Sequence, residues 1–271
     1  MNSLNLPPLL LVGCGKMGGA MLAGWLEQGL SEAVVVEPYA ASAAAFASRV
    51  TVVPSPAAIP AGFRPAVIVL AIKPQEAAAT LPNFAHLAGP ETLVVSIMAG
   101  RNIAGMQALL GAQAAVVRAM PNTPAAVRQG YTCCYPSSAV SPAQRALADR
   151  LLSAVGLVDW VDDEALIDPV TAVSGGGPAY VFLLAEVLEA AAIEQGLPPA
   201  LARRMARATV SGSGALLAAS TEDSAQLRKN VTSPKGTTER ALNVLMEPDA
   251  WPKLMSQAIA AATARSRELA G

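Results

Sequence analysis

The first half of the chain alternates short apolar runs with turns rich in glycine, proline or polar residues. The runs occupy residues 9–12, 33–36, 66–72, 92–97 and 115–120, and each is almost continuously apolar. Such runs are typical of strands covered on both faces of a parallel sheet. Further strands are expected at 131–135 and 157–161, with a helix that begins at Ser141-Pro142 between them. This pattern predicts a doubly wound, mainly parallel α/β sheet.

The second half shows helical periodicity only. Helices are expected at residues 180–195, 201–220, 225–231, 238–246 and 251–270, and the strand pattern ends near Asp163. We therefore predict two domains, residues 1–163 and an all-helical domain over residues 164–271. Alanine and aliphatic residues surround much of each helix, which is expected where the helices of two subunits interleave.

A glycine-rich turn follows the first strand directly. Gly13-Cys14-Gly15-Lys16-Met17-Gly18 leads from that strand into a helical pattern. Gly13 permits a tight turn, Gly15 lets a pyrophosphate approach the backbone, and Gly18 lets the helix pack on the strand. The pyrophosphate would lie at the N-terminus of the helix. The unit predicts a Rossmann-type dinucleotide-binding domain.

Other residues at the ends of the strands point to the same ligand. Glu37 ends the second strand, where an acidic residue binds a ribose 2′-hydroxyl, although it could simply begin a turn with Pro38. The ends of the next strands, residues 71–74, 96–100 and 120–124, would line one crevice. The alternative is ordinary turn chemistry, with Lys73 as a solvated charge.

A second candidate site is the loop Asn230-Val231-Thr232-Ser233-Pro234-Lys235-Gly236-Thr237-Thr238-Glu239. Pro234 fixes one backbone angle and Gly236 frees another, while Thr237 or Thr238 stands where an N-cap would precede the next helix. Free amides and hydroxyls at a positive helix end predict a site for a carboxylate-sized anion. The alternative is a well-capped connection between two helices.

Composition indicates an oligomer that binds small molecules. Of the 271 residues, 53% are hydrophobic and 14% are charged, against roughly 25% charged in an average soluble domain, so less surface should face water than in a monomer. The net charge of −1, the pI of about 5.9 and the lack of like-charge blocks argue against nucleic acid and anionic membranes. Charges such as Glu186 and Glu189 interrupt the apolar stretches, so no membrane span is expected. No secretory signal is expected either.

The cysteines and the histidine offer no metal or redox site. Cys14, Cys133 and Cys134 have neither a metal-ligand spacing nor an even count, and they favour a reducing cytoplasm. Because neighbours in a strand point to opposite faces, one of Cys133 and Cys134 should lie in the core and the other should point outward. His86, the single histidine, is expected in a solvated loop, which argues against a mechanism with histidine as the acid–base.

Four segments together resemble the pyrroline-5-carboxylate reductases. They are residues 12–19, 71–74, 174–180 and 231–238, and the resemblance extends over essentially the whole chain. It implies reduction of pyrroline-5-carboxylate to L-proline, a Rossmann domain followed by a helical dimerisation domain, and a homodimer with a ring of five dimers as the larger option. NADPH is the implied cofactor, with NADH open because Glu37 would repel a 2′-phosphate.

The resemblance also assigns roles to residues. The implied cofactor residues are Gly13, Cys14, Gly15, Lys16, Met17, Gly18, Glu37, Ala71, Ile72, Lys73, Pro74, Ser96, Met98 and Ala99. The implied substrate residues are Val231, Ser233, Gly236, Thr237 and Thr238. A protonated cyclic imine brings its own proton, so a strong enzymic acid is dispensable. The Thr238 hydroxyl would orient the ring nitrogen, and the amides of Gly236 and Thr237 would bind the carboxylate.

Besides Glu37, two positions depart from the family pattern. Lys235 replaces a usual glycine, which argues against a positive φ there, and we expect its side chain to point to water rather than to a substrate carboxylate. Gly176 replaces a usual serine. Glu222 lies near an acidic position of the family, and a surface role is equally compatible with it.

Two rival functions remain at this stage. A β-hydroxyacid dehydrogenase has a similar fingerprint and a helical second domain, but it uses a lysine within a long helix, where this chain offers Arg203, Arg204 and Arg207. A nucleotide-sensing protein without turnover would keep the three glycines of the fingerprint but would not need the loop 233–238. The presence of both features favours an enzyme.

Overall fold

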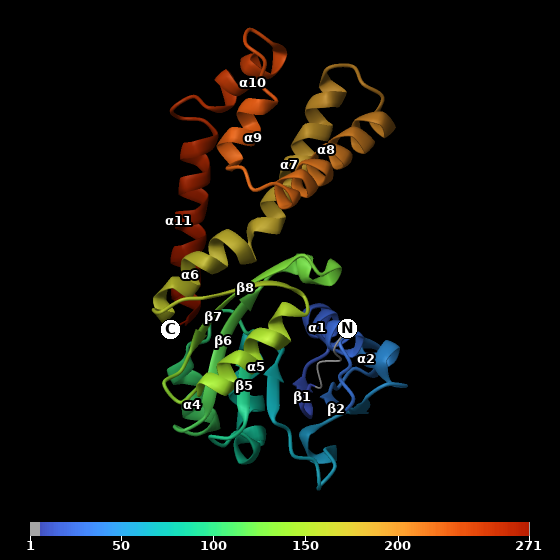
Figure 1. The fold of residues 1–271 in the computed structure, drawn as a ribbon, viewed down its shortest axis with the longest axis vertical. Coiled ribbons are helices and arrows are strands. Elements are labelled where there is room, and N and C mark those ends of the chain that lie inside the picture. Colours follow the sequence, from blue (N-terminus) through green and yellow to red (C-terminus); the bar gives the residue numbers. More distant parts are fainter. Residues whose placement is uncertain (1–5, 271) are drawn as a thin grey trace. The chain divides into compact units, whose positions relative to one another are not determined.

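The computed structural model describes residues 6–270, which form two compact units. The first unit comprises Met1–Gly175 with Ala262–Gly271, and the second comprises Gly176–Ala261 (Figure 1). The strands are β1 Leu9–Val12, β2 Ala33–Val36, β3 Thr51–Val53, β4 Val67–Leu70, β5 Leu93–Ser96, β6 Ala115–Pro121, β7 Gly130–Pro136 and β8 Gly156–Trp160. The helices of the first unit are α1 Lys16–Glu27, α2 Ala40–Ala43, α3 Ala77–Thr80, α4 Ile103–Leu110, α5 Pro142–Ser153 and α6 Ile167–Val170. The remaining helices are α7 Gly177–Glu194, α8 Pro199–Ala219, α9 Ser224–Asn230, α10 Thr237–Leu245 and α11 Trp251–Ala270.

All the described strands belong to one sheet in the order β3-β2-β1-β4-β5-β6-β7-β8. Strands β1 to β6 are parallel to one another, β7 runs antiparallel to β6, and β8 is parallel to β7. The predicted mainly parallel, doubly wound sheet is confirmed. Strand β3 was missed, because Thr51 is exposed and only Val53 is buried, so the segment lacks an apolar run.

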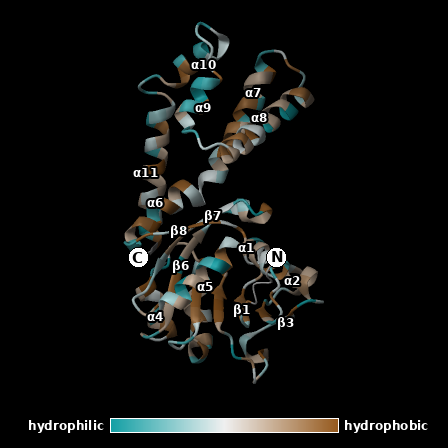
Figure 2. Ribbon diagram, in the orientation of Figure 1, coloured by the Kyte–Doolittle hydropathy of each residue, from teal (hydrophilic) through white to brown (hydrophobic). Residues whose placement is uncertain are grey.

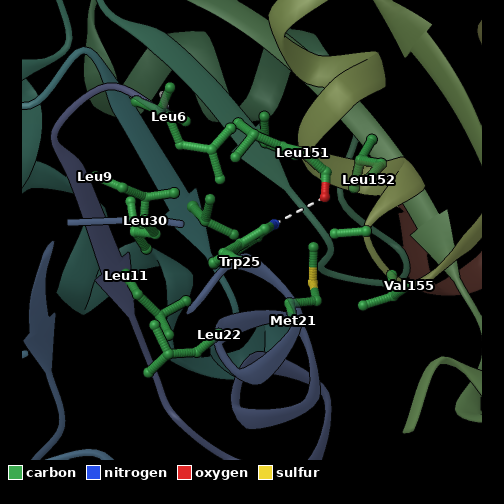
Figure 3. Packing of buried hydrophobic residues seen from close by; sticks show 14 of the residues in the cluster. Leu6, Leu9, Leu11, Met21, Leu22, Trp25, Leu30, Leu151, Leu152 and Val155 are labelled. Atoms are coloured by element: carbon green, nitrogen blue, oxygen red, sulfur yellow. Dashed lines mark hydrogen bonds between the residues drawn. The ribbon is translucent and has the colours of Figure 1, made fainter. Parts of the chain in front are cut away.

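The sheet is covered on both faces, and the side chains of β1 alternate between two cores. Leu9 and Leu11 pack with residues of α1 and α5, whereas Leu10 and Val12 pack with residues of α3 and α4. In the first core the Trp25 indole Nε1 donates a 2.7 Å hydrogen bond to the Leu151 carbonyl, which ties α1 to α5 (Figure 3). The polar end of this large buried ring is thereby satisfied.

The expectation for the two neighbouring cysteines is wrong. Cys133 and Cys134 in β7 are both buried, with 1% and 0% of their surface exposed. Cys134 belongs to the core beneath α1 and α5. The opposite face of β7 is covered by α6, the short helix that follows the last strand. The side chains of the strand do alternate between its two faces, but both faces are buried. The sequence pattern did not reveal the helix that covers the second face.

The end of the last helix belongs to the first unit. The Ser266 hydroxyl of α11 donates a 2.8 Å hydrogen bond to Asp168 Oδ1 of α6, and Arg118 Nη2 of β6 lies 3.6 Å from the same oxygen. Arg118 Nη1 also pairs with Glu164 Oε1 at 3.1 Å. The boundaries between the compact units therefore lie after Gly175 and before Ala262. The division into domains of residues 1–163 and 164–271 stays a prediction.

The helical unit has almost no core of its own. Of residues 176–261, all of which the structure describes, only Ala202 and Ala206 are buried, although α7 and α8 pack against each other. Large apolar side chains stand exposed, among them Phe182 at 68% and Leu183 at 56%. Figure 2 shows apolar residues along much of α7. Burial of this much apolar surface requires a partner.

One stretch of this region bears on the expectation that the chain has no membrane span. Among the described residues, Glu164–Glu194 is long and apolar enough to cross a membrane by length and composition alone. Glu186 and Glu189 lie within this stretch, and their charges do not exclude it by composition. The stretch contains a π-helical segment at Thr171–Gly175 between α6 and α7, so it combines several helical segments. A second protein subunit would bury its apolar face equally well.

Candidate functional site

The glycine-rich loop has the geometry that its sequence predicts. Gly13 has φ of 91°, and a Cβ there would lie 2.6 Å from the Ala71 carbonyl oxygen. A Cβ on Gly18 would lie 2.4 Å from the Gly13 carbonyl oxygen. By contrast, a Cβ on Gly15 would meet nothing within 4 Å. The loop is thus closely packed at Gly13 and Gly18 and open at Gly15, where a ligand would reach the backbone.

Helix α1 begins immediately after this open position. Gly15 is its N-cap and offers no side chain, so the amides of Lys16, Met17 and Gly18 have no acceptor within the helix. These three donors and the positive end of the helix dipole form a ready site for a pyrophosphate.

Glu37 is built into the same loop from the end of β2. Its side chain is buried, with the residue 7% exposed, and both carboxylate oxygens accept backbone hydrogen bonds. Oε2 accepts from the Cys14 amide at 2.7 Å, and Oε1 accepts from the Tyr39 amide at 2.9 Å. The sequence left two interpretations of Glu37, a ligand of a ribose and a residue that begins a turn. The two interpretations are compatible, because the carboxylate that begins the turn also reaches the glycine-rich loop.

Cys14 is an inert thiol within this loop. The residue is 2% exposed, and burial, followed by the Glu37 carboxylate, raises the pKa of the thiol to about 11. Its side chain belongs to the core beneath α1 and α5. Cys14 can serve a ligand through its backbone but not as a nucleophile.

A cavity of about 600 Å³ lies at the carboxyl ends of the central strands. The predicted cofactor residues that line it are Gly13, Gly15, Glu37, Ala71, Ile72 and Lys73. Tyr39, Ser42, Ser55 and Asn83 are among its other lining residues. These four were missed, because they follow β2, β3 and α3, and no cofactor motif marks those segments.

The remaining predicted cofactor residues lie outside the cavity wall. Met98 is a core residue, and its amide donates to the buried Ser96 hydroxyl at 3.3 Å. The third loop expected at the crevice holds Asn122, whose amide nitrogen donates to Ser174 Oγ at 3.2 Å and whose Oδ1 accepts from the Tyr131 amide. Roles for Pro74, Ser96, Met98 and Ala99, like those of the other predicted cofactor residues, stay predictions.

The loop between α9 and α10 holds a strained residue. Lys235 has φ of 60°, so the expectation that lysine excludes a positive φ is wrong. Its amide donates a 2.9 Å hydrogen bond to Glu239 Oε2, and Pro234 precedes it. A left-handed conformation costs a residue with a Cβ about 1–2 kcal/mol. The neighbouring turn and the Glu239 side chain together compensate for that cost.

The start of α10 differs from the prediction at the cap. Gly236 is the N-cap and Thr237 is the first helical residue, so neither threonine caps the helix through its side chain. The Gly236 amide already donates to the Ser233 carbonyl at 3.0 Å. Thr237 and Thr238 instead offer the first helical amides, which lack intrahelical acceptors. Both residues are exposed, so these donors can reach a ligand.

Neighbouring side chains stiffen the same loop. Asn230 Nδ2 donates to Glu222 Oε2 at 3.0 Å, and its Oδ1 accepts from Gln226 at 2.7 Å. The Thr232 hydroxyl donates to the Arg228 carbonyl at 2.6 Å. Glu222 thus supports the end of α9, which the sequence pattern could not assign.

Comparison with protein-family models matches both halves of the chain. Residues 9–100 match the family described as NADP oxidoreductase coenzyme F420-dependent, and residues 164–269 match pyrroline-5-carboxylate reductase dimerisation. Fold and site thus define an NAD(P)H-dependent oxidoreductase with a Rossmann domain followed by a helical dimerisation domain. A pyrroline-5-carboxylate reductase of Pseudomonas aeruginosa is 41% identical, with 98% of each chain covered. One of Synechocystis is 38% identical, with 96% of this chain and 97% of the relative covered. The chain belongs to the pyrroline-5-carboxylate reductase family.

Solved structures agree with this assignment. A pyrroline-5-carboxylate reductase of Coxiella burnetii superposes with a TM-score of 0.90 at 32% identity, covering 98% of this chain and 100% of that one. The enzyme of Plasmodium falciparum, solved with NADP bound, superposes with a TM-score of 0.83 at 26% identity, covering 98% of each chain. The predicted fold, including the helical dimerisation domain, is confirmed.

Proposed function

We propose that the chain reduces 1-pyrroline-5-carboxylate to L-proline with NAD(P)H, as the last step of proline biosynthesis. The observation that carries this proposal is the similarity to curated pyrroline-5-carboxylate reductases over 98% of the chain at 41% identity. The glycine-rich loop and the loop before α10 supply the two kinds of binding group that the reaction needs. The family assignment leaves no reason to favour a hydroxyacid dehydrogenase or a sensor without turnover.

The residues of the first unit fit a nicotinamide dinucleotide. The open position at Gly15 and the three amides at the start of α1 suit its pyrophosphate. Residues 71–74 with Ser96, Met98 and Ala99 are assigned to the nicotinamide end, and Glu37 to the adenosine ribose. When bound, the dihydronicotinamide supplies a hydride to the carbon of the substrate C=N bond.

The loop before α10 is assigned to the substrate. The amides of Thr237 and Thr238 hold the carboxylate at the positive end of the helix, and Val231, Ser233 and Gly236 shape the turn around it. The Thr238 hydroxyl accepts a hydrogen bond from the protonated ring nitrogen and so fixes the plane of the C=N bond. The nitrogen keeps that proton in the product, so the residues transfer none.

Turnover by purified protein with NADH and, separately, NADPH tests this assignment. We expect oxidation of the reduced nucleotide that depends on pyrroline-5-carboxylate, followed at 340 nm. Thr238→Ala should lower kcat by about 100-fold because the imine loses its orientation, whereas Thr238→Ser should keep most of the rate. Unchanged kcat in Thr238→Ala would remove Thr238 from the mechanism. No oxidation by the wild-type protein would refute the function.

The assembly follows from the helical unit. The dimerisation family and the exposed apolar helices support a homodimer, and we propose a ring of five dimers as the complete form. Burial between subunits, rather than in a membrane, accounts for the apolar stretch Glu164–Glu194. We assign the protein to the cytoplasm, without nucleic-acid or membrane partners. Light scattering at several protein concentrations gives the mass, and a mass of one dimer throughout would exclude the ring.

Two observations bear on the nucleotide preference. The family resemblance favours NADPH, and the Plasmodium falciparum relative was solved with NADP. The side chains around Glu37 favour NADH.

A further inference from the structure

The Glu37 carboxylate is fixed in place by the backbone around it. Its two oxygens accept the Cys14 and Tyr39 amides at 2.7 and 2.9 Å, and the residue is 7% exposed. A rotation of the side chain away from the loop would leave the buried Cys14 amide without its acceptor, which is costly. Unlike a surface glutamate, Glu37 cannot turn aside for a negatively charged ligand.

The part of the cavity beside this carboxylate, near the ends of β2 and β3, has no cation among its described lining residues. Glu37 and Glu76 line it, and the polar wall near the ends of β2 and β3 consists of neutral side chains such as Ser42 and Ser55. Among the described lining residues the single cation is Lys73. Lys73 follows β4, which lies on the far side of β1 from β2. A 2′-phosphate on the adenosine ribose would therefore meet a carboxylate and no compensating guanidinium or ammonium group.

We propose that Glu37 makes this enzyme select NADH over NADPH. The inference rests on the proposed function for the identity of the cofactor. Each carboxylate oxygen keeps a lone pair after accepting its backbone amide, so the ribose 2′-hydroxyl of NADH can donate to it. The 2′-phosphate of NADPH brings about two negative charges to the same place, and the fixed carboxylate repels it. Because the Cys14 amide of the glycine-rich loop holds the Glu37 carboxylate in place, the loop itself contributes to the discrimination between NADH and NADPH.

The test is direct binding of the two nucleotides, measured by calorimetry without substrate. We expect the Kd of NADH to be at least about tenfold lower than that of NADPH. Equal Kd values, tighter binding of NADPH, or binding of neither nucleotide would overturn the inference. Preferential NADH binding without turnover of pyrroline-5-carboxylate would support the inference and refute the proposed function. Turnover with a preference for NADPH would do the opposite.

Two matched variants assign the effect to the residue. Glu37→Gln removes the charge and should reduce the ratio of the two Kd values by about tenfold, toward parity. Glu76→Gln makes the same change at an exposed carboxylate in the same cavity wall and should leave the ratio within about twofold, because solvent screens that charge. An unchanged ratio in Glu37→Gln, or an equal change in both variants, would contradict the inference.

A competition experiment covers the case in which Glu37→Gln does not fold. Adenosine 5′-diphosphate and adenosine 2′,5′-bisphosphate are titrated against NADH bound to the wild-type protein. We expect the compound with a free 2′-hydroxyl to compete at a concentration at least about tenfold lower. Equal competition, or stronger competition by the 2′-phosphate compound, would overturn the inference without use of any variant.

Discussion

The Ser266 hydroxyl lies 2.8 Å from Asp168 Oδ1, although the two residues are 98 positions apart in the chain. Arg118 approaches the same carboxylate, and its other nitrogen pairs with Glu164. Glu164 Oε1 in turn accepts the Ile103 amide at 2.8 Å, at the start of α4. The Asp168 carboxylate, which the buried Arg118 guanidinium approaches, thus joins the segment that leads toward the helical unit to the segment that returns from it.

Loss of that guanidinium should be severe. Arg118→Met leaves Asp168 and Glu164 without their cation, and we expect a decrease of about 3–5 kcal/mol in the free energy of unfolding. Urea unfolding at a fixed protein concentration measures it. Arg265→Met is the control, because its pair with Glu268 is exposed and is worth less than about 1 kcal/mol. Similar losses in both variants would show that the buried cluster has no special role.

Two glycines of the fingerprint should separate stability from binding. Gly18→Ala brings a Cβ against the Gly13 carbonyl, so we expect a lower Tm and loss of nucleotide binding together. Gly15→Ala has room in the protein and should keep its Tm, but its methyl group occupies the approach to the pyrophosphate. Thermal unfolding with and without nucleotide tests both. Normal nucleotide binding by Gly15→Ala would place the pyrophosphate elsewhere.

The fold was largely predictable because the central strands are buried on both faces and therefore read as apolar runs. β3 and α6 escaped this reasoning, since one is short and partly exposed and the other has only four residues. The expectation that one of Cys133 and Cys134 points outward was wrong for that reason: the helix that covers the second face of β7 carries no periodic signal.

The candidate site was predictable where a backbone requirement selects a residue type. Gly13, Gly15 and Gly18 are such positions, and each has the predicted geometry. Lys235 shows the limit, because the Glu239 side chain holds it in a conformation that its own Cβ disfavours. The residue types alone do not show that the Glu239 carboxylate, four positions later, accepts the Lys235 amide.

Replacement of the strained lysine should be tolerated. Lys235→Gly removes the left-handed strain, so we expect the free energy of unfolding to rise by up to about 1 kcal/mol. Lys235→Val keeps the Cβ and adds branching, and it should destabilise by at least as much. Because the side chain is exposed, the KM for pyrroline-5-carboxylate should change by less than about twofold in Lys235→Gly. A much larger KM would show that the ammonium group binds the substrate carboxylate.

The Cys14 thiol should give stability a dependence on alkaline pH. Its pKa is raised from 9.0 to about 11, so the folded state favours the neutral thiol. The resulting stability is complete below pH 9 and is lost as the pH rises through about 11, a change of roughly 2–3 kcal/mol. Urea midpoints of wild type and Cys14→Ala over pH 8–11 isolate it. Parallel pH profiles would contradict the prediction.

The same burial should make the cysteines unreactive. Cys14, Cys133 and Cys134 are all buried, and burial raises the pKa of each thiol. We expect Ellman's reagent at pH 8 to label none of them rapidly in the folded protein and all three after denaturation. Fast labelling of one thiol in the folded protein would show that its neighbourhood opens readily.

A charge on the apolar helical surface should separate the subunits. Phe182 is 68% exposed, and Phe182→Asp should lower the oligomer mass in light scattering because the aspartate would be buried against a partner. Leu157→Asp is the control, since Leu157 is 73% exposed in β8 of the first unit. An unchanged mass in Phe182→Asp would place the interface on other helices.

The return of α11 to the first unit constrains how the chain is made. Arg118 leaves the ribosome with β6, but Ser266 follows only after the helical segment Gly176–Ala261. The Arg118 ion pairs can therefore form first, but Asp168 gains its hydroxyl donor only once the helical segment has been synthesised. Removal of the segment around Ser266 should consequently destabilise a unit whose other residues lie far earlier in the sequence. A chain that stops near residue 260 would keep every glycine of the fingerprint and yet lack the hydroxyl that binds Asp168 of α6.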